Sequence, residues 1–136
     1  MLPEHLRDLV AIHMPVIALA ETGPTPADLT NAPYLDRWMP MREFTGRIVL
    51  FGDVTGHPIL RNTGIVTSQL FGIDTRAGWA RTLSRWYRLG QPLILDNRAF
   101  PCPRGFLPVT DPDVLAAALA AHADEIRRLA AEARDQ

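Results

Sequence analysis

Hydrophobic residues at the start of the chain recur at the spacing of an amphipathic helix. The apolar-face positions of the first twenty residues are Leu2, Leu6, Leu9, Val10, His13, Ile17 and Ala20. Their period is close to 3.6 residues, which predicts a helix. Pro15 lies within this run, and an internal proline removes a backbone donor and clashes with the preceding turn. We therefore expect a kink or two short helices.

A second, short helix is predicted after Gly23-Pro24. Thr25-Pro26-Ala27-Asp28 places a hydroxyl at the cap, a proline at the first helical position and an acid three residues after the cap. Ala32-Pro33 stops this helix, because the residue before a proline avoids the helical conformation.

The C-terminal helix has the clearest signals. Asp111 caps it, Pro112 is its first residue and Asp113 complements the helix dipole. Its apolar seam, with alternating spacings of four and three, is Leu115, Leu119, His122, Ile126, Leu129 and Ala133. We expect this seam to pack against the sheet. The alternative is that it joins two copies of the chain into a homodimer, which the titration of His122 would make sensitive to pH.

The middle of the chain has the amino-acid composition of β-strands. Residues 47–51 and 65–73 are rich in β-branched and aromatic residues, and turn signals separate them. We expect two antiparallel neighbours in a sheet. Residues 91–109 contain four prolines and should form at most one short edge strand, over residues 93–95.

Residues 79–89 fit two structures. A helix would be capped by Asp74 and Gly90. The Thr, Trp and Tyr content favours a strand or hairpin, which we prefer and in which Arg81 and Arg85 would project together beside Tyr87. The predicted fold class is thus α+β: a small antiparallel β-sheet or partial barrel flanked by N-terminal helices and a C-terminal helix. Its parts are a helical 1–36, a β core at 46–95 and a helix at 111–135.

Composition agrees with one globular domain spanning 1–136. The chain has 136 residues, of which 47% are hydrophobic and 21% charged, so it can bury a core without disulfides or metals. The single cysteine, Cys102, excludes a disulfide framework and is expected to be a small apolar filler. All basic residues are arginine, which suggests a bacterial genome of high GC content. The absence of a basic leader and of a long apolar run predicts a cytoplasmic protein that does not insert in a membrane.

Charge is distributed unevenly along the chain. Residues 1–36 carry a net charge of −4, residues 37–104 carry +6, and residues 105–136 carry −3. A basic middle between acidic ends indicates intramolecular complementarity, a dimer, or a cationic face for an acidic partner.

Three motifs carry a resemblance to a known family. Gly56-His57-Pro58, Thr67-Ser68 and the run from Trp79 to Gly90 (WARTLSRWYRLG) resemble a family of short bacterial proteins of unknown function, in which they recur in this order. The resemblance covers residues 46–92. It implies a small β unit with helical flanks and supplies no activity, so no catalytic residue is carried over.

Candidate enzymatic chemistry is limited to one weak set. Asp53, His57 and Ser68 (with Ser84 as another possible nucleophile) are of the types that a small hydrolase uses, although His57 could equally cap a turn. No Gly-x-Ser-x-Gly motif is present. The four histidines are scattered and no Gly-rich phosphate loop occurs, so neither a metal nor a cofactor is expected.

An arginine–aromatic cluster offers the stronger functional hypothesis. Its seven members are Arg76, Trp79, Arg81, Arg85, Trp86, Tyr87 and Arg88. Guanidinium groups pair with carboxylates or phosphates, and aromatic rings anchor interfaces or stack on bases. The alternative is that the tryptophans are core residues and the arginines pair with Asp53, Asp74 and the acidic flanks. We expect a non-enzymatic binding or regulatory module that engages an acidic partner. A protein is favoured over nucleic acid, which is the alternative partner, because the net charge of the chain is −1.

Overall fold

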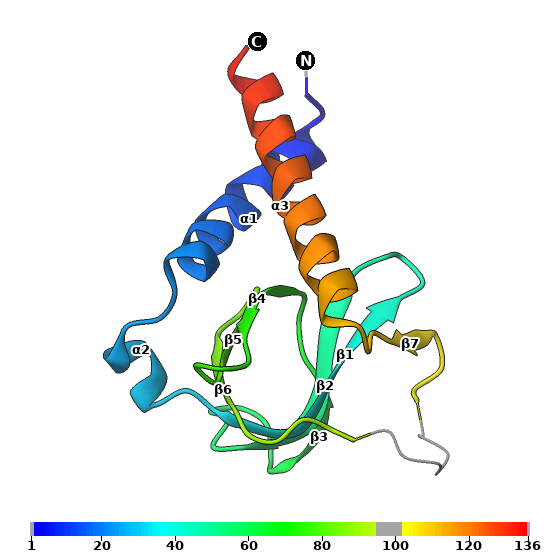
Figure 1. Ribbon diagram of the computed structural model, residues 1–136. Helices are drawn as coiled ribbons and strands as arrows, with labels where there is room; N and C mark the ends of the chain where they lie inside the picture. Colours follow the sequence, from blue (N-terminus) through cyan, green and yellow to red (C-terminus); the bar gives the residue numbers. More distant parts are fainter. Residues whose placement is uncertain (1, 95–101, 136) are drawn as a thin grey trace.

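The computed structural model describes residues 2–94 and 102–135, and it has an α+β fold in which two long helices stand on a curved sheet (Figure 1). The predicted fold class is confirmed, and the sheet is mixed and not closed. The elements in chain order are α1 (Glu4–Thr22), α2 (Pro26–Thr30), β1 (Tyr34–Glu43), β2 (Ile48–Thr55), β3 (Thr63–Val66), β4 (Leu70–Asp74), β5 (Trp79–Thr82), β6 (Trp86–Leu89), β7 (Phe106–Pro108) and α3 (Pro112–Arg134).

The helices begin where their capping residues predict. Thr25 and Asp28 form a reciprocal capping box at α2, with N···O distances of 2.8 and 3.2 Å, and Asp111 accepts a hydrogen bond from the Asp113 amide at α3. Of the two outcomes predicted at Pro15, two short helices is wrong, because α1 is a single helix that contains this proline. Pro15 and Ala11, whose carbonyl lacks a helical partner, are both exposed, so water can satisfy that carbonyl.

The strand β1 is central to the sheet and was not predicted. It pairs with β2 antiparallel and with β6 parallel, in the order β3-β2-β1-β6-β5-β4, and β7 also pairs with β1. The sheet therefore starts at Tyr34, before the expected β core at 46–95 and inside the expected helical part at 1–36. Pro40 and a bulge between Asp36 and Met39, where Arg37 has a φ of 48°, break the sequence alternation that would have indicated a strand.

Two further predictions about strands need correction. Residues 65–73 form two strands, because β3 pairs with β2 while β4 pairs with β5 at the other edge of the sheet. Residues 93–94 form no strand, since Pro92 makes only an isolated bridge to Trp38, and Leu95 lies outside the described residues. The edge strand is β7 instead. Next to it, Cys102 packs with the apolar cluster around Met41, as a small filler would.

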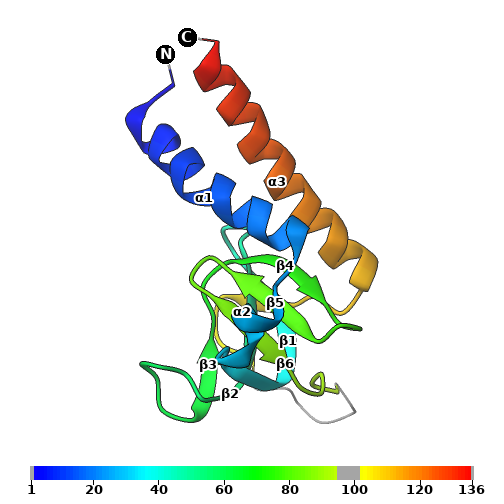
Figure 2. The same ribbon diagram turned by 90° about the vertical axis from the view of Figure 1, so that its left-hand side faces the viewer.

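The core lies inside the curve of the sheet, and the helices cover its open end (Figure 2). Leu115 at the start of α3 packs in the sheet core, whereas Ile126 and Leu129 pack against Leu2 and Ile17 near and on α1. The apolar seam of α3 is thus used within the chain, first by the sheet and then by α1. The helices approach the sheet closely, since a Cβ on Gly72 of β4 would lie 2.9 Å from the Cβ of Ala20.

Candidate functional site

Three segments that are distant in sequence meet at one place on the sheet. Ser68, between β3 and β4, has its Oγ 3.0 Å from the Oγ of Ser84 in the β5–β6 turn. The ring of His57, in the β2–β3 loop, lies 6.5 Å from the ring of Tyr87. Each segment belongs to one of the three motifs of the family resemblance. We call His57, Ser68, Ser84, Arg85 and Tyr87 the three-motif site.

The imidazole of His57 is held in one orientation by its own loop. Its Nδ1 accepts hydrogen bonds from the amides of Ile59 and Leu60, both at 3.0 Å. A nitrogen that accepts carries no proton, so the proton of the neutral ring is on Nε2. His57 therefore caps a turn and offers a single N–H donor to other groups.

Arg85 supplies the positive charge of the three-motif site. Within residues 2–94 and 102–135 its guanidinium has no hydrogen bond or carboxylate partner, and the side chain is half-buried. Burial lowers the pKa of His57, and the nearby charge of Arg85 lowers it further. Burial raises the pKa of Tyr87, while Arg85 acts in the opposite direction. Arg85 is thus within electrostatic reach of His57 and adjacent in sequence to Ser84, and guanidinium, imidazole N–H and hydroxyl groups are each donors to an anion.

The residues of the hydrolase alternative do not form a catalytic chain. Asp53 pairs with Arg37, whose Nε donates to Oδ2 at 2.7 Å. His57 bonds to its own loop and Ser68 bonds to Ser84. The nucleophile–base–carboxylate sequence of hydrogen bonds that activates a serine is therefore not formed by these three residues.

The arginine–aromatic cluster is divided between two faces of the β5–β6 hairpin. Arg81 is paired with Trp86, and Trp79 with Arg88, so these four side chains share one face. Tyr87 is on the opposite face. The predicted placement of Arg81 beside Tyr87 is wrong, because the turn at residues 83–85 restarts the alternation of sides, whereas Arg85 does lie within electrostatic reach of Tyr87.

The face that carries Arg81 and Arg88 packs toward α1 and α2 (Figure 2). Arg81 donates from Nε to the Thr82 carbonyl at 2.9 Å and lies 5.3 Å from the Trp86 ring centroid. Arg88 donates to the Ala32 carbonyl at 2.9 Å. Trp79 and Trp86 make an edge-to-face contact at 5.4 Å. These four residues stabilise the packing of the hairpin, and Arg81 and Arg88 do so through backbone carbonyls.

Arg76 lies apart from the rest of the cluster. It is exposed in the β4–β5 turn, where the Asp74 carboxylate accepts hydrogen bonds from the amides of Arg76 and Ala77. Asp74 therefore organises the turn through backbone contacts.

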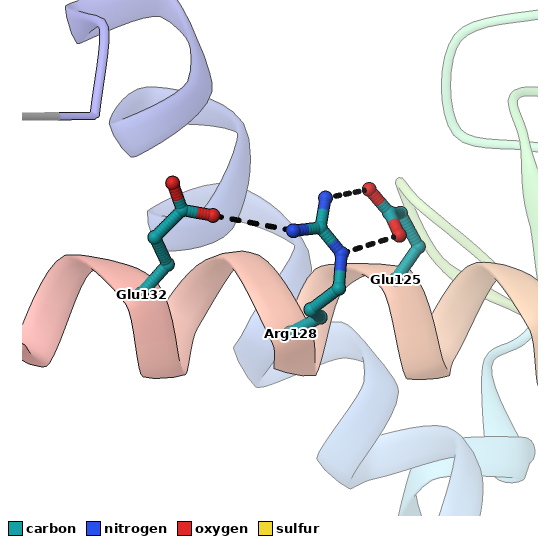
Figure 3. Close-up of polar contacts among 3 residues, drawn as sticks. All are labelled: Glu125, Arg128 and Glu132. Atoms are coloured by element: carbon teal, nitrogen blue, oxygen red, sulfur yellow. Dashed lines mark hydrogen bonds and ion pairs between the residues drawn. The ribbon is translucent and has the colours of Figure 1, made fainter.

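Arg127 and Arg128 of the acidic C-terminal helix pair with nearby carboxylates. Arg128 lies between Glu125 and Glu132 on α3, with N···O distances of 2.6 and 3.2 Å (Figure 3). Arg127 pairs with Glu21 of α1 and with Asp124. Among the described residues no ion pair joins the basic middle segment to the acidic ends. The carboxylates of the helices thus leave the arginines of the sheet uncompensated by direct contact.

Comparison with known proteins identifies the family. A family of unknown function (DUF6634) matches residues 7–99. The chain belongs to the DUF6634 family. This confirms the resemblance to a family of unknown function, and the match extends beyond residues 46–92 on both sides. It contains the whole three-motif site and ends before α3. No curated protein and no solved structure matches the chain.

Metal ligands and membrane-spanning helices are two further features that bear on this DUF6634 protein. The described part of the chain contains no group of three or more histidine, cysteine or acidic side chains arranged to hold a metal ion. None of its described helices combines the length and apolar character needed to cross a membrane.

Sequence reasoning identified the members of the three-motif site only in part. Arg85 and Tyr87 were assigned to the arginine–aromatic cluster, and His57 and Ser68 to a hydrolase. Ser84 was considered only as a nucleophile. The signal that joins them is the recurrence of their three motifs, which gives no distance until the strands are placed.

Proposed function

We propose that this DUF6634 protein is a non-enzymatic binding or regulatory module that engages an acidic protein partner at the three-motif site. The observation that carries the proposal is the half-buried Arg85 guanidinium, which has no carboxylate partner among the described residues. An arginine held this way stays available for a carboxylate from another molecule.

The neighbours of Arg85 add hydrogen-bond donors whose side chains are held in place by other hydrogen bonds. The tautomer of His57 presents Nε2–H, because its other nitrogen is occupied by two amides. The Ser68 and Ser84 hydroxyls share one hydrogen bond, so one of them keeps a proton to donate elsewhere. An acidic side chain would thus meet several donors at fixed positions, and little conformational entropy would be lost on binding.

The surroundings favour a protein over a nucleic acid. Ile59 and Leu60, directly after the His57 turn, are 78% and 43% exposed, which suits an apolar contact with a protein. Trp86 and Tyr87 are 8% and 3% exposed and are unavailable for stacking on bases. Acidic residues flanked by apolar ones are the partner chemistry that fits best.

The other members of the arginine–aromatic cluster have secondary roles in this proposal. Arg76 is exposed and would add a positive charge in the β4–β5 turn, whereas Trp79, Arg81, Trp86 and Arg88 shape the hairpin. A cytoplasmic location and a bacterial source are part of the same proposal. A homodimer through α3 would have to displace the contacts of its seam with α1 and the sheet.

The proposal is tested by fluorescence anisotropy with labelled probes and the full chain. The probes are a peptide of alternating Glu and Leu, the same peptide with Gln for Glu, and a single-stranded oligonucleotide with the same number of negative charges. We expect the Glu peptide to bind best. Arg85→Gln should weaken that binding about tenfold, the loss of one charge-assisted hydrogen-bond pair.

Arg7→Gln is the matched control, because Arg7 is exposed in the first turns of α1, far from the sheet (Figure 2). It should bind the Glu peptide like the unchanged chain. Equal affinity of Arg85→Gln and the unchanged chain would overturn the proposal. Tighter binding of the oligonucleotide, with a steep loss between low and moderate salt, would replace it by nucleic-acid binding.

A further inference from the structure

A cavity lies where the two long helices meet the sheet. Its volume is about 450 Å³, and it is bounded by α1, α3, the β1–β2 turn, the loop between β3 and β4, and the β5–β6 turn. Small-molecule sites in proteins commonly fall between about 300 and 1,000 Å³ and combine an apolar wall with a few polar groups. The cavity has both properties.

Two histidines from different helices form part of its wall. His13 of α1 and His122 of α3 are 109 positions apart, and their nitrogens Nδ1 and Nε2 lie 2.9 Å from each other. His13 is only 5% exposed. When both rings are neutral, either ring can be the donor of this hydrogen bond. In both cases one of the two remaining nitrogens, His13 Nε2 and His122 Nδ1, carries a proton and the other does not.

An arginine from the β1–β2 turn also lines the cavity. Arg47 has no carboxylate partner in the part of the chain that the structure describes. Burial lowers the pKa of both His13 and His122, and the charge of Arg47 lowers each of them further, so the guanidinium is within electrostatic reach of both rings. Glu125 of α3 acts on His122 in the opposite direction and more weakly.

Apolar side chains supply about half of the cavity wall, and Thr45, Ser68 and Gln69 add polar groups to it. Its leucines include Leu9 from α1, Leu70 from β4 and Leu119 from α3, and Arg47 supplies the one guanidinium among the described lining residues. One positive charge beside neutral imidazoles matches a monoanion, whereas a phosphate dianion is ordinarily held by several donors or cations.

We propose that this cavity binds a small-molecule carboxylate with an apolar body. The carboxylate pairs with the Arg47 guanidinium and accepts the free N–H of the His13–His122 pair, and the apolar body lies among the leucines. The site goes beyond the proposed partner binding, because it uses Arg47 and the helix pair rather than Arg85. Ser68 lines the cavity and also belongs to the three-motif site, so the two sites share the β3–β4 loop.

The test is isothermal titration of the full chain with octanoate and with phenylbutyrate, each compared with its uncharged amide. We expect both carboxylates to bind and the amides to bind at least about tenfold more weakly, since the charge-assisted pair is lost. Arg47→Gln should bind the carboxylates as weakly as the unchanged chain binds the amides. Arg61→Gln, an exposed arginine in the β2–β3 loop, is the matched control and should keep full affinity.

Side-chain ¹⁵N spectra locate the bound carboxylate. The imidazole signals of His13 and His122 should shift on addition of octanoate, while that of His57 stays in place. Absence of binding by both carboxylates, equal binding of the amides, or a shift of His57 alone would overturn the proposal. If the Arg47→Gln variant binds the Glu peptide with full affinity but no longer binds octanoate, the cavity and the three-motif site are independent binding sites.

Discussion

At the scale of single residues, the arginines of the β5–β6 hairpin divide by the acceptors that they find. Arg81 and Arg88 donate to backbone carbonyls of the same chain and are thereby committed to the fold. Arg85, in the turn between them, has no such acceptor in the described residues. Identical side chains a few positions apart thus have different roles, because only Arg81 and Arg88 find backbone acceptors.

This division predicts different effects on stability. Arg81→Met should lower the free energy of unfolding by about 1 to 2 kcal/mol, because it removes a hydrogen bond and a cation–π contact. Arg85→Met should change it by less than about 0.5 kcal/mol, as at an ordinary surface position. Urea denaturation of both variants measures the difference. Equal destabilisation would show that Arg85 also supports the hairpin.

The sequence predicted the residue types at the site but not their grouping. Strict alternation along residues 79–89 placed Arg81 beside Tyr87. The hairpin turn changes that arrangement, and no composition argument reveals where such a turn lies. The capping function of His57 was foreseeable from its Gly-His-Pro turn, and its two amide donors confirm it.

At the scale of elements, local chemistry predicted helices better than strands. The caps of α2 and α3 are short-range hydrogen bonds, so a few adjacent residues determine them. The strand β1 depends on partners far along the chain, and Pro40 and the bulge at Arg37 concealed its alternation. The split between β3 and β4 likewise follows from pairing at opposite edges of the sheet, which residues 65–73 alone do not encode.

The contact between α1 and α3 makes stability depend on pH. Burial and Arg47 lower the pKa of His13 and His122 in the folded state, whereas unfolded imidazoles titrate near about 6.5. Above that pH both states are neutral and these groups add no pH dependence. Below it the unfolded state takes up protons that the folded state does not, so stability falls as pH falls.

Urea denaturation between pH 7.5 and 5.5, about one unit on either side of the unfolded pKa, measures this loss. His13→Gln should reduce the pH dependence, because one of the coupled imidazoles is gone. His5→Gln, an exposed position on the same helix, is the control and should keep it. A pH dependence that is unchanged in His13→Gln would contradict the role of the histidine pair.

At the scale of the whole molecule, charge is separated between two layers. Arg127 and Arg128 of α3 pair with carboxylates of the helices, as Figure 3 shows for Arg128, while the loops of the sheet carry Arg47 and Arg85 without carboxylate partners in the described chain. The segment charges predicted this polarity. They did not predict that the two proposed sites would share the β3–β4 loop, because that follows from the curvature of the sheet and the placement of both helices.

The most direct measurement of the central claim is a backbone ¹H–¹⁵N titration of the full chain with the Glu–Leu peptide. If the three motifs form one binding site, the amides of residues 57–60, 67–69 and 83–86 will shift together and saturate with one affinity. Shifts confined to one of these segments, or centred on the β4–β5 turn or on the helices, would contradict it.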